Sequence, residues 1–253
     1  MTSPWLPFTN RKPQPELDLY CLPYAGGNAS LYSQWDRYFP DWIAVHPVEL
    51  PGRGTRICET LEQEPAVLAE RLFDALLARR TRPFALLGHS MGGGLAFHLS
   101  HYAERRGRSP TQIFVAGRQA PIIGSRRNRL CMSDQALIEE LRFLNGSPPE
   151  LFEHPELMAL MLPIVRADFT LSERMLNGDG DKRIHTPIHV IGSRDDPEVD
   201  HRHLMRWQEN AYATIRLSLL EGGHFFIHDC GAEIASLATR DMTLIAHPAH
   251  REG

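Results

Sequence analysis

Short, mostly apolar runs recur along the chain and are bounded by prolines, glycines or polar residues. Runs of this length with turn signals at their ends are typical of buried strands. They lie at 17–22, 43–48, 84–87, 113–116, 188–192 and 215–219. Helical patterns separate several of them, and a strand–helix–strand order implies parallel strands with helices on both faces of the sheet. The pattern therefore predicts an α/β fold with a mostly parallel central sheet flanked by helices.

The helical patterns are those in which apolar residues recur with the period of an α-helix. They are clearest at 61–80, at 95–106 and in the C-terminal segment after residue 226, with a further helix-like stretch around Trp207. An amphipathic stretch at 31–39 follows a glycine turn and should pack its apolar side on the sheet.

The alternation stops between residues 117 and 185. This segment holds one apolar stripe at 137–144, another at 157–165, and several prolines. Both stripes are expected to face the core first and to line a binding surface second. We predict a single domain over 1–253, with a helical insertion at about 120–185 over the C-terminal ends of the strands.

Composition narrows the range of partners. The chain has 253 residues, of which 42% are hydrophobic and 23% are charged, as in an ordinary globular enzyme. A net charge of −4 provides no basic surface for nucleic acid. No apolar run has the length of a membrane span, and the N-terminal segment lacks the order of a signal peptide. The four cysteines are widely spaced, so we expect free thiols and a cytoplasmic protein without membrane association.

The segment Gly-His-Ser-Met-Gly at 88–92 lies between the run at 84–87 and a helical pattern. Gly-x-Ser-x-Gly in this context is the nucleophile elbow of an α/β hydrolase, where the serine occupies a tight turn. The glycines let strand and helix approach closely, and the helix directs free N–H groups toward whatever Ser90 attacks. We therefore predict the α/β-hydrolase fold, with the insertion at 120–185 as a helical lid between strands. A glycine-rich turn with a solvent-facing serine is the alternative.

A serine nucleophile needs a base within hydrogen-bonding reach, and the base needs an orienting carboxylate. In this fold they occur in the order serine, acid, histidine, with the last two in loops after later strands. Ser90, Asp196 and His224 satisfy that order. Asp195 remains an alternative to Asp196, because geometry rather than position defines a triad. His224 and His228 are spaced like helical metal ligands, but no glutamate follows His224, so no metal site is predicted.

Two backbone amides are candidates for an oxyanion hole. The glycine loop at 24–30 departs from the phosphate-loop and dinucleotide-binding patterns. A loop after an early strand can instead bring a backbone N–H, that of Ala25, over the serine. The second donor would be the N–H of Met91, which follows the nucleophile. An ordinary strand-to-helix turn at 24–30 is the alternative.

Two cationic features have more than one interpretation. Arg53, in the rigid loop at 49–54, could hold an anionic group of a substrate or cap a helix. The cluster of Arg126, Arg127 and Arg129 could dock an acidic partner or form a solvated charged face.

Five segments, taken in order, carry a resemblance to a known family. They are Leu-Pro-Tyr-Ala-Gly-Gly at 22–27, Leu-Pro-Gly-Arg-Gly at 50–54, Gly-His-Ser-Met-Gly-Gly at 88–93, Leu-Pro-Ile-Val-Arg-Ala-Asp-Phe at 162–169 and Gly-Gly-His-Phe-Phe at 222–226. Together they resemble the type II thioesterases, the free-standing editing enzymes of polyketide and nonribosomal peptide assembly lines. The likeness covers nearly the whole chain.

The resemblance implies hydrolysis of aberrant or stalled acyl groups from the phosphopantetheine thioester of a carrier protein. It implies Ser90 as nucleophile, Asp196 as acid, His224 as base, and the amides of Ala25 and Met91 as the oxyanion hole. The substrate carries the phosphopantetheine, so no cofactor is implied. The partners would be acyl or peptidyl carrier domains of a synthase.

Other functions use the same residues differently. A general serine esterase or lipase would act on small diffusible esters with the same triad and no carrier docking. A non-enzymatic binder on a hydrolase scaffold would lack a triad member. Product-releasing macrocyclisation is a further possibility, but it is disfavoured because domains that perform it are usually fused to a synthase. Family members often have an aromatic residue shortly after the lid glutamate, whereas Glu173 is followed by Arg-Met-Leu at 174–176, so acyl-chain preference is not carried over.

Overall fold

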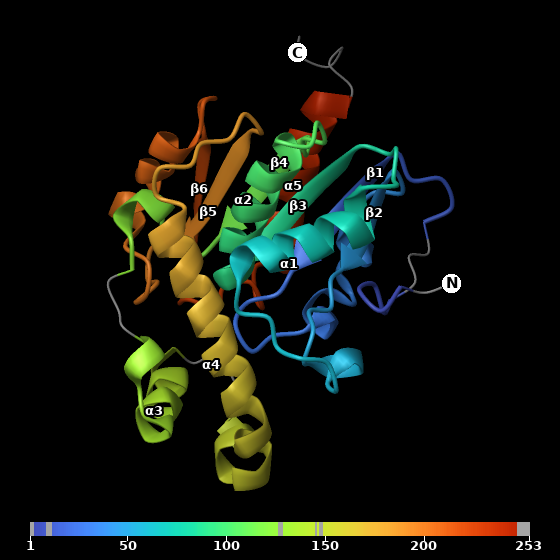
Figure 1. Cartoon of the computed structure of the whole chain (residues 1–253). Helices are drawn as coiled ribbons and strands as arrows, with labels where there is room; N and C mark the ends of the chain where they lie inside the picture. The colour runs from blue at the N-terminus through green and yellow to red at the C-terminus, as the bar shows by residue number, and fades with distance from the viewer. Residues whose placement is uncertain (1–2, 9–11, 126–128, 145, 147–148, 247–253) are drawn as a thin grey trace.

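In the described chain, six strands form one sheet in the order β2-β1-β3-β4-β5-β6, and each neighbouring pair is parallel (Figure 1). The strands are β1 (Leu17–Leu22), β2 (Ile43–Pro47), β3 (Phe84–His89), β4 (Gln112–Ala116), β5 (Ile188–Ser193) and β6 (Arg216–Leu220). The computed structural model describes residues 3–8, 12–125, 129–144, 146 and 149–246. The predicted α/β architecture is confirmed.

The strands are buried on both faces, which explains their nearly continuous apolar sequences. Every residue within the five strands β1, β2, β3, β4 and β5 is buried. The edge strand β6, which begins with Arg216, is partly exposed. Successive side chains enter opposite layers: Leu86 belongs to the hydrophobic cluster that includes Leu95 of α2, and Leu87 belongs to the cluster that includes Ile234 of α5.

The helices of the described chain form the outer layers of the fold. They are α1 (Pro65–Leu72), α2 (Met91–Glu104), α3 (Asp134–Leu144), α4 (Pro155–Gly178) and α5 (Gly231–Ala246). Helices α1 and α2 cover one face of the sheet and α5 covers the other (Figure 1). No described helix combines the length and the apolar character needed to cross a bilayer.

Some helical segments differ from their predicted form. The helix predicted at 61–80 begins only at Pro65, a residue favoured in the first helical turn, and ends in a π-helical turn, Phe73–Leu77. The amphipathic stretch at 31–39 forms two short 3₁₀ helices, Ala29–Tyr32 and Trp35–Tyr38. The segment around Trp207 is also 3₁₀, over His201–Asn210.

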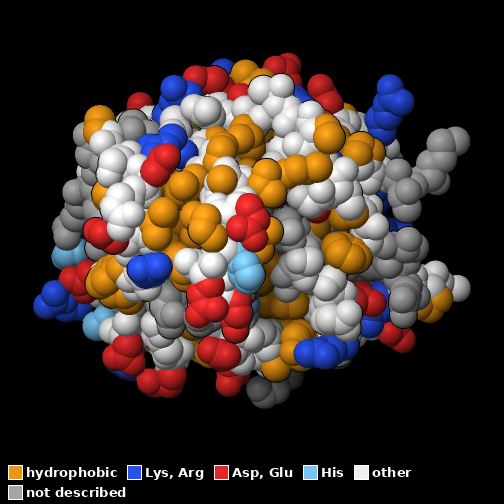
Figure 2. All heavy atoms as spheres, turned by 90° about the horizontal axis from the view of Figure 1, so that it is seen from below, with side chains coloured by type: hydrophobic (Ala, Val, Ile, Leu, Met, Phe, Trp, Pro, Cys, Tyr) orange, Lys and Arg blue, Asp and Glu red, His pale blue; other side chains and the backbone are white. Residues whose placement is uncertain are grey.

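Helices α3 and α4 lie between β4 and β5 in sequence. Their apolar stripes pack on each other through a small cluster that includes Leu141, Val165 and Phe169. Helix α4 continues through Pro163, projects below the sheet, and has α3 beside its lower half (Figure 1). Figure 2, which views the molecule from this end, shows hydrophobic side chains gathered across the middle of the face and acidic side chains below them.

The strand order places a crevice at one end of the sheet. After β1 the chain moves outward to β2, and β3 returns to the other side of β1. In open α/β sheets, ligands bind outside the carboxyl ends of the strands at such a reversal. The loops that leave β1 and β3 there carry Ala25 and Ser90.

Candidate active site

Ser90 occupies a strained turn between β3 and α2. Its φ is 52° and its ψ is −115°, and among the described residues it is the one non-glycine with positive φ. Such strain persists only where surrounding structure enforces it, and it is typical of functional turns. The strand begins and the helix ends within a residue or two of the predicted limits, but the helix starts at Met91 rather than residue 95.

The glycines on either side of Ser90 allow this turn. A Cβ on Gly88 would lie 2.0 Å from the carbonyl oxygen of Gly92. A Cβ on Gly92 would lie 2.2 Å from the carbonyl oxygen of Leu22, at the end of β1. Strand β3, helix α2 and strand β1 therefore approach one another only because both side chains are absent.

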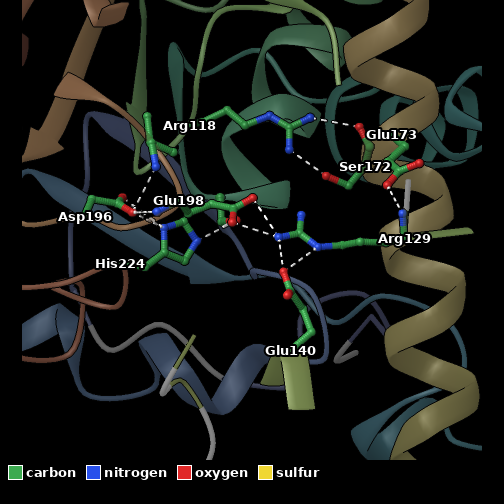
Figure 3. Close-up of polar contacts among 10 residues, drawn as sticks. Arg118, Arg129, Glu140, Ser172, Glu173, Asp196, Glu198 and His224 are labelled. Atoms are coloured by element: carbon green, nitrogen blue, oxygen red, sulfur yellow. Dashed lines mark hydrogen bonds and ion pairs between the residues drawn. The ribbon is translucent and has the colours of Figure 1, made fainter. Parts of the chain in front are cut away.

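The structure brings Ser90, His224 and Asp196 into one hydrogen-bonded line. Nε2 of His224 lies 3.1 Å from Oγ of Ser90. Nδ1 of the same ring lies 2.9 Å from Oδ2 and 3.0 Å from Oδ1 of Asp196 (Figure 3). A carboxylate can only accept, so Nδ1 carries the proton and Nε2 is left to accept from the Ser90 hydroxyl. Asp195, the alternative acid, is exposed and does not line the cavity described below.

The Asp196 carboxylate is itself held by the backbone that follows it. The N–H groups of Glu198 and Val199 donate to Oδ1 at 2.8 and 3.1 Å. These bonds aim the carboxylate at the imidazole without further side chains. Asp196 and His224 are both buried, so their interaction is little screened by water.

The two predicted oxyanion donors lie beside Ser90. Ala25 and Met91 line the same cavity as Ser90 and His224. Within the described residues, neither amide N–H donates to an acceptor of the chain. Met91 is the first residue of α2, so its N–H also lies at the positive end of the helix dipole. Both groups are thus free to bind an anion.

Two cavities meet near these groups. One, of about 580 Å³, contains the Ser90–His224–Asp196 line and has many polar side chains in its wall, among them Arg118, Gln119 and Ser172. The other, of about 550 Å³, is lined mainly by apolar residues, among them Leu141 and Leu144 of α3 and Leu157, Met161 and Val165 of α4. Both are bordered by Tyr24, Ala25, Leu141, Leu144 and Phe225.

Arg129 lines the polar cavity and belongs to a partly buried ion-pair network. Its Nη2 donates to Oε1 of Glu140 at 2.6 Å and to Oε2 of Glu198 at 2.7 Å (Figure 3). Glu140 belongs to α3 and Glu198 to the loop after β5 that also carries Asp196. The ion pairs therefore connect the insertion to the loop that holds Asp196. Two carboxylates of the chain therefore pair with the Arg129 guanidinium, and docking of an acidic partner by the arginine cluster stays a prediction. Arg126 and Arg127 lie outside the described residues.

Arg53 is also committed within the chain. It is buried and forms a two-pronged ion pair with Asp168 of α4. Its side chain is therefore not free to hold a substrate anion, and although Arg53 immediately precedes the 3₁₀ helix Gly54–Arg56, the side chain makes no capping hydrogen bond there. The anion that it holds is a carboxylate of the protein.

A second serine–histidine–aspartate line lies elsewhere in the fold. Nδ1 of His189 donates to Oδ2 of Asp241 at 2.7 Å, and Nε2 of the same ring lies 2.9 Å from Oγ of Ser218. None of these residues lines either cavity. The distances alone therefore do not make a catalytic site: a cavity and free amide donors beside the serine are also needed.

In the described part of the chain, no three His, Cys, Asp or Glu side chains are grouped to hold a metal ion.

His89, inside the elbow, lies beside the ring of His224. Its ring centroid lies 5.2 Å from that of His224, and it is completely buried. Burial, assisted by the two nearby histidines, lowers the pKa of His89 well below its usual range. His89 is therefore neutral and adds no charge beside His224.

Fold and site together define a class of protein. A parallel sheet with a serine on a strained turn after β3, bonded to a histidine that is bonded to an aspartate, is the arrangement of the α/β hydrolases. The model of the Thioesterase domain family matches residues 18–240, and the chain belongs to that family. It is accordingly a hydrolase of thioesters.

Relatives of similar length support this assignment. Linear gramicidin dehydrogenase LgrE of Brevibacillus parabrevis is 35% identical over 231 residues, covering 89% of this chain and 88% of that protein. Gramicidin S biosynthesis protein GrsT of Aneurinibacillus migulanus is 32% identical over 252 residues, covering 96% of each. The structure of the type II thioesterase BorB from the borrelidin biosynthetic cluster is 32% identical, with a TM-score of 0.82 and coverage of 96% and 99%. The predicted resemblance to type II thioesterases is confirmed.

Sequence reasoning missed the groups that support the site. Asp168 and Arg53 both lie in segments that the resemblance singled out, at 162–169 and 50–54, so a signal was present, but the pairing of the two side chains was not predicted. Glu140 and Glu198 carried no local signal, because their role depends on contacts with Arg129 made across the fold.

Proposed function

We propose that the chain is an editing type II thioesterase of polyketide or nonribosomal peptide synthesis. Its substrates would be acyl groups on the phosphopantetheine thioester of acyl or peptidyl carrier proteins. The observation that carries the proposal is the line from Ser90 Oγ through His224 to Asp196, at 3.1 and 2.9 Å, inside a cavity between the sheet and α3–α4 of a thioesterase-family chain.

The chemistry assigns one task to each group. His224 takes the proton as Ser90 Oγ attacks the thioester carbonyl, and the amides of Ala25 and Met91 bind the oxyanion. His224 then delivers that proton to the departing pantetheine sulfur, leaving an acyl-enzyme. Water then attacks the ester as His224 takes its proton, and His224 returns that proton to Ser90 Oγ as the free acid leaves. Asp196 keeps the ring oriented and stabilises the imidazolium.

The two cavities suit the two parts of such a substrate. The polar cavity, which contains Ser90, offers hydrogen-bonding partners for the amides of a pantetheine arm. The apolar cavity between the glycine loop and α4 offers a surface for an acyl chain. In this proposal, the insertion between β4 and β5 is a lid whose inner surface selects the acyl group, and the chain itself supplies all the groups used in the reaction.

A general esterase and a dehydrogenase are the two alternative functions. A general esterase would use the same groups on small diffusible esters. The name of LgrE describes a dehydrogenase, but the glycine loop of the present chain lacks the dinucleotide-binding pattern, and an aligned Ser–His–Asp line serves acyl transfer rather than hydride transfer.

The test compares wild type, Ser90→Ala and Ser218→Ala on acetyl-, propionyl- and longer acyl-carrier proteins, with the carrier mass as readout. Ser218→Ala is the matched control, because it removes a hydroxyl from the second serine–histidine–aspartate line. We expect acyl loss with wild type and Ser218→Ala but not with Ser90→Ala. Turnover of small esters without acyl-carrier turnover would favour the general esterase, and inactivity on both would favour a binder.

A further inference from the structure

The glycine loop that carries Ala25 is held from outside by two charged side chains. Asp168, on α4, is completely buried, and its Oδ2 accepts from the N–H of Gly26 at 2.7 Å. Arg53, after β2, donates from Nη1 to Oδ2 and from Nη2 to Oδ1 of the same carboxylate, at 2.5 and 2.7 Å. Nη1 also lies 3.3 Å from the carbonyl oxygen of Gly27. The pair therefore holds the loop at one donor and at one acceptor.

These contacts lead directly to the Ala25 amide. The N–H of Gly27 donates to the carbonyl oxygen of Tyr24 at 2.9 Å. That carbonyl and the N–H of Ala25 belong to one planar trans peptide, in which they point in opposite directions. Fixing Gly27 therefore fixes the direction of the Ala25 N–H.

The loop needs such a restraint because it is rich in glycine. Gly26 has a φ of +77°, and glycine loses more conformational freedom on ordering than other residues. Helix α4 also packs on this glycine, since a Cβ there would lie 3.1 Å from Cγ2 of Val165. Val165 and Asp168 are three residues apart and share a helix face. One face of α4 thus sets both the position and the orientation of the loop.

We propose that Asp168 and Arg53 are positioning residues that aim the Ala25 N–H at the oxyanion. This inference rests on the proposed function, because it assumes that the Ala25 amide binds the oxyanion formed at Ser90. It also gives α4 a part in the chemistry: the helix that lines the acyl cavity presents the carboxylate that holds the oxyanion loop.

The test separates positioning from simple structural support. Asp168→Asn keeps the size of the side chain but loses the ion pair with Arg53. Asp18→Asn is the matched control. Asp18 is also buried, accepts a hydrogen bond from Arg82 and is hydrogen-bonded to His46, but it lies near the start of β1, whereas the glycine loop follows the end of that strand. Both variants are assayed for kcat and KM on an acyl-carrier protein and a small ester. The inhibition constant of an alkylboronic acid, whose adduct with Ser90 places an oxygen in the oxyanion hole, is measured as well.

For Asp168→Asn we expect kcat to fall about 10²-fold, the scale of losing one oxyanion donor, with KM within about twofold. The boronic acid should bind more weakly by a similar factor. Asp18→Asn should lose thermal stability while keeping its kcat and inhibition constant. If Asp168→Asn behaves like Asp18→Asn in all three readouts, the inference is overturned and the pair only anchors α4.

Two further arms keep the outcomes distinct. If Asp168→Asn does not fold, Arg53→Lys takes its place, because lysine keeps the charge but loses the two-pronged geometry. Arg53→Lys should lower kcat and weaken boronic acid binding by about tenfold. Unchanged kinetics in Arg53→Lys would then overturn the inference. If wild type fails on carriers but hydrolyses the ester, the carrier proposal fails, and the ester and boronic acid data still decide the role of Asp168.

Discussion

Both carboxylate oxygens of Asp196 lie within 3.0 Å of Nδ1 of His224, while the neighbouring carboxylate of Asp195 is exposed and outside the cavity. Two adjacent acids that the sequence alone does not separate are therefore distinguished by geometry. Only Asp196 is placed to hold the imidazole with its Nδ1 protonated.

We accordingly expect Asp196→Asn to lower kcat by about 10⁴-fold, because an amide at this place favours the wrong tautomer of His224. Asp195→Asn is the matched control and should stay within about twofold of wild type. Steady-state kinetics on an acyl-carrier protein provide the measurement. A large loss in Asp195→Asn with little change in Asp196→Asn would reverse the assignment.

The close approach at the elbow predicts an effect on stability. Gly92→Ala forces a Cβ against the carbonyl oxygens of Leu22 and Pro23, so we expect a loss of about 3 kcal/mol or more in the free energy of unfolding. Gly178→Ala makes the same change where no atom lies within 4 Å, and should be neutral or gain about 0.5–1 kcal/mol. Urea unfolding at pH 7 measures both. Equal stabilities for the two variants would contradict the packing argument.

The apolar cavity predicts a change in chain-length preference. Met161 lines this cavity from α4, whereas its neighbour Leu160 is 65% exposed and does not. Met161→Trp should lower kcat/KM for long acyl chains by about 10-fold or more, because each methylene excluded from an apolar pocket costs about 1–3 kcal/mol. Acetyl turnover should change little, and Leu160→Trp should leave the whole profile intact. A uniform loss across all chain lengths would show that the cavity does not hold the acyl chain.

The buried Asp241 predicts how stability depends on acidity. Burial alone would raise the pKa of Asp241, but the hydrogen bond from His189 and the charge of Arg216 outweigh it and hold the pKa below its usual value. A lowered folded-state pKa means that the carboxylate contributes stability above about pH 4, and that this contribution is lost as the pH falls further.

Asp241→Asn should therefore be less stable than wild type at pH 7, by about 1–3 kcal/mol, and the difference should shrink as the pH falls below about 4. Urea unfolding between pH 7 and pH 3 measures the difference. A gap that widens on acidification would be the wrong sign and would refute this linkage. Glu233→Gln removes an exposed carboxylate from the first turn of α5 and is the control for the loss of a charge on that helix.

Much of this protein could be predicted from local sequence, because the relevant constraints are local. Nearly continuous apolar runs indicated strands buried on both faces, and the structure has them within one or two residues. The elbow could be recognised because a serine on a strained turn needs glycines at fixed offsets, where strand and helix touch. The order serine, acid, histidine could be predicted because each residue follows a strand whose carboxyl end reaches the same edge of the sheet.

Only the tertiary structure decided which charged groups meet. Arg53 and Asp168 are separated by 115 residues, and nothing near either residue reveals that one neutralises the other. Arg129 looked like part of a surface cluster until the fold placed it between Glu140 and Glu198. The physical reason is that an isolated charge in the sequence carries no record of its burial. Burial and pairing arise when α3, α4 and the strand-end loops are brought together, and the same packing selects Asp196 over Asp195.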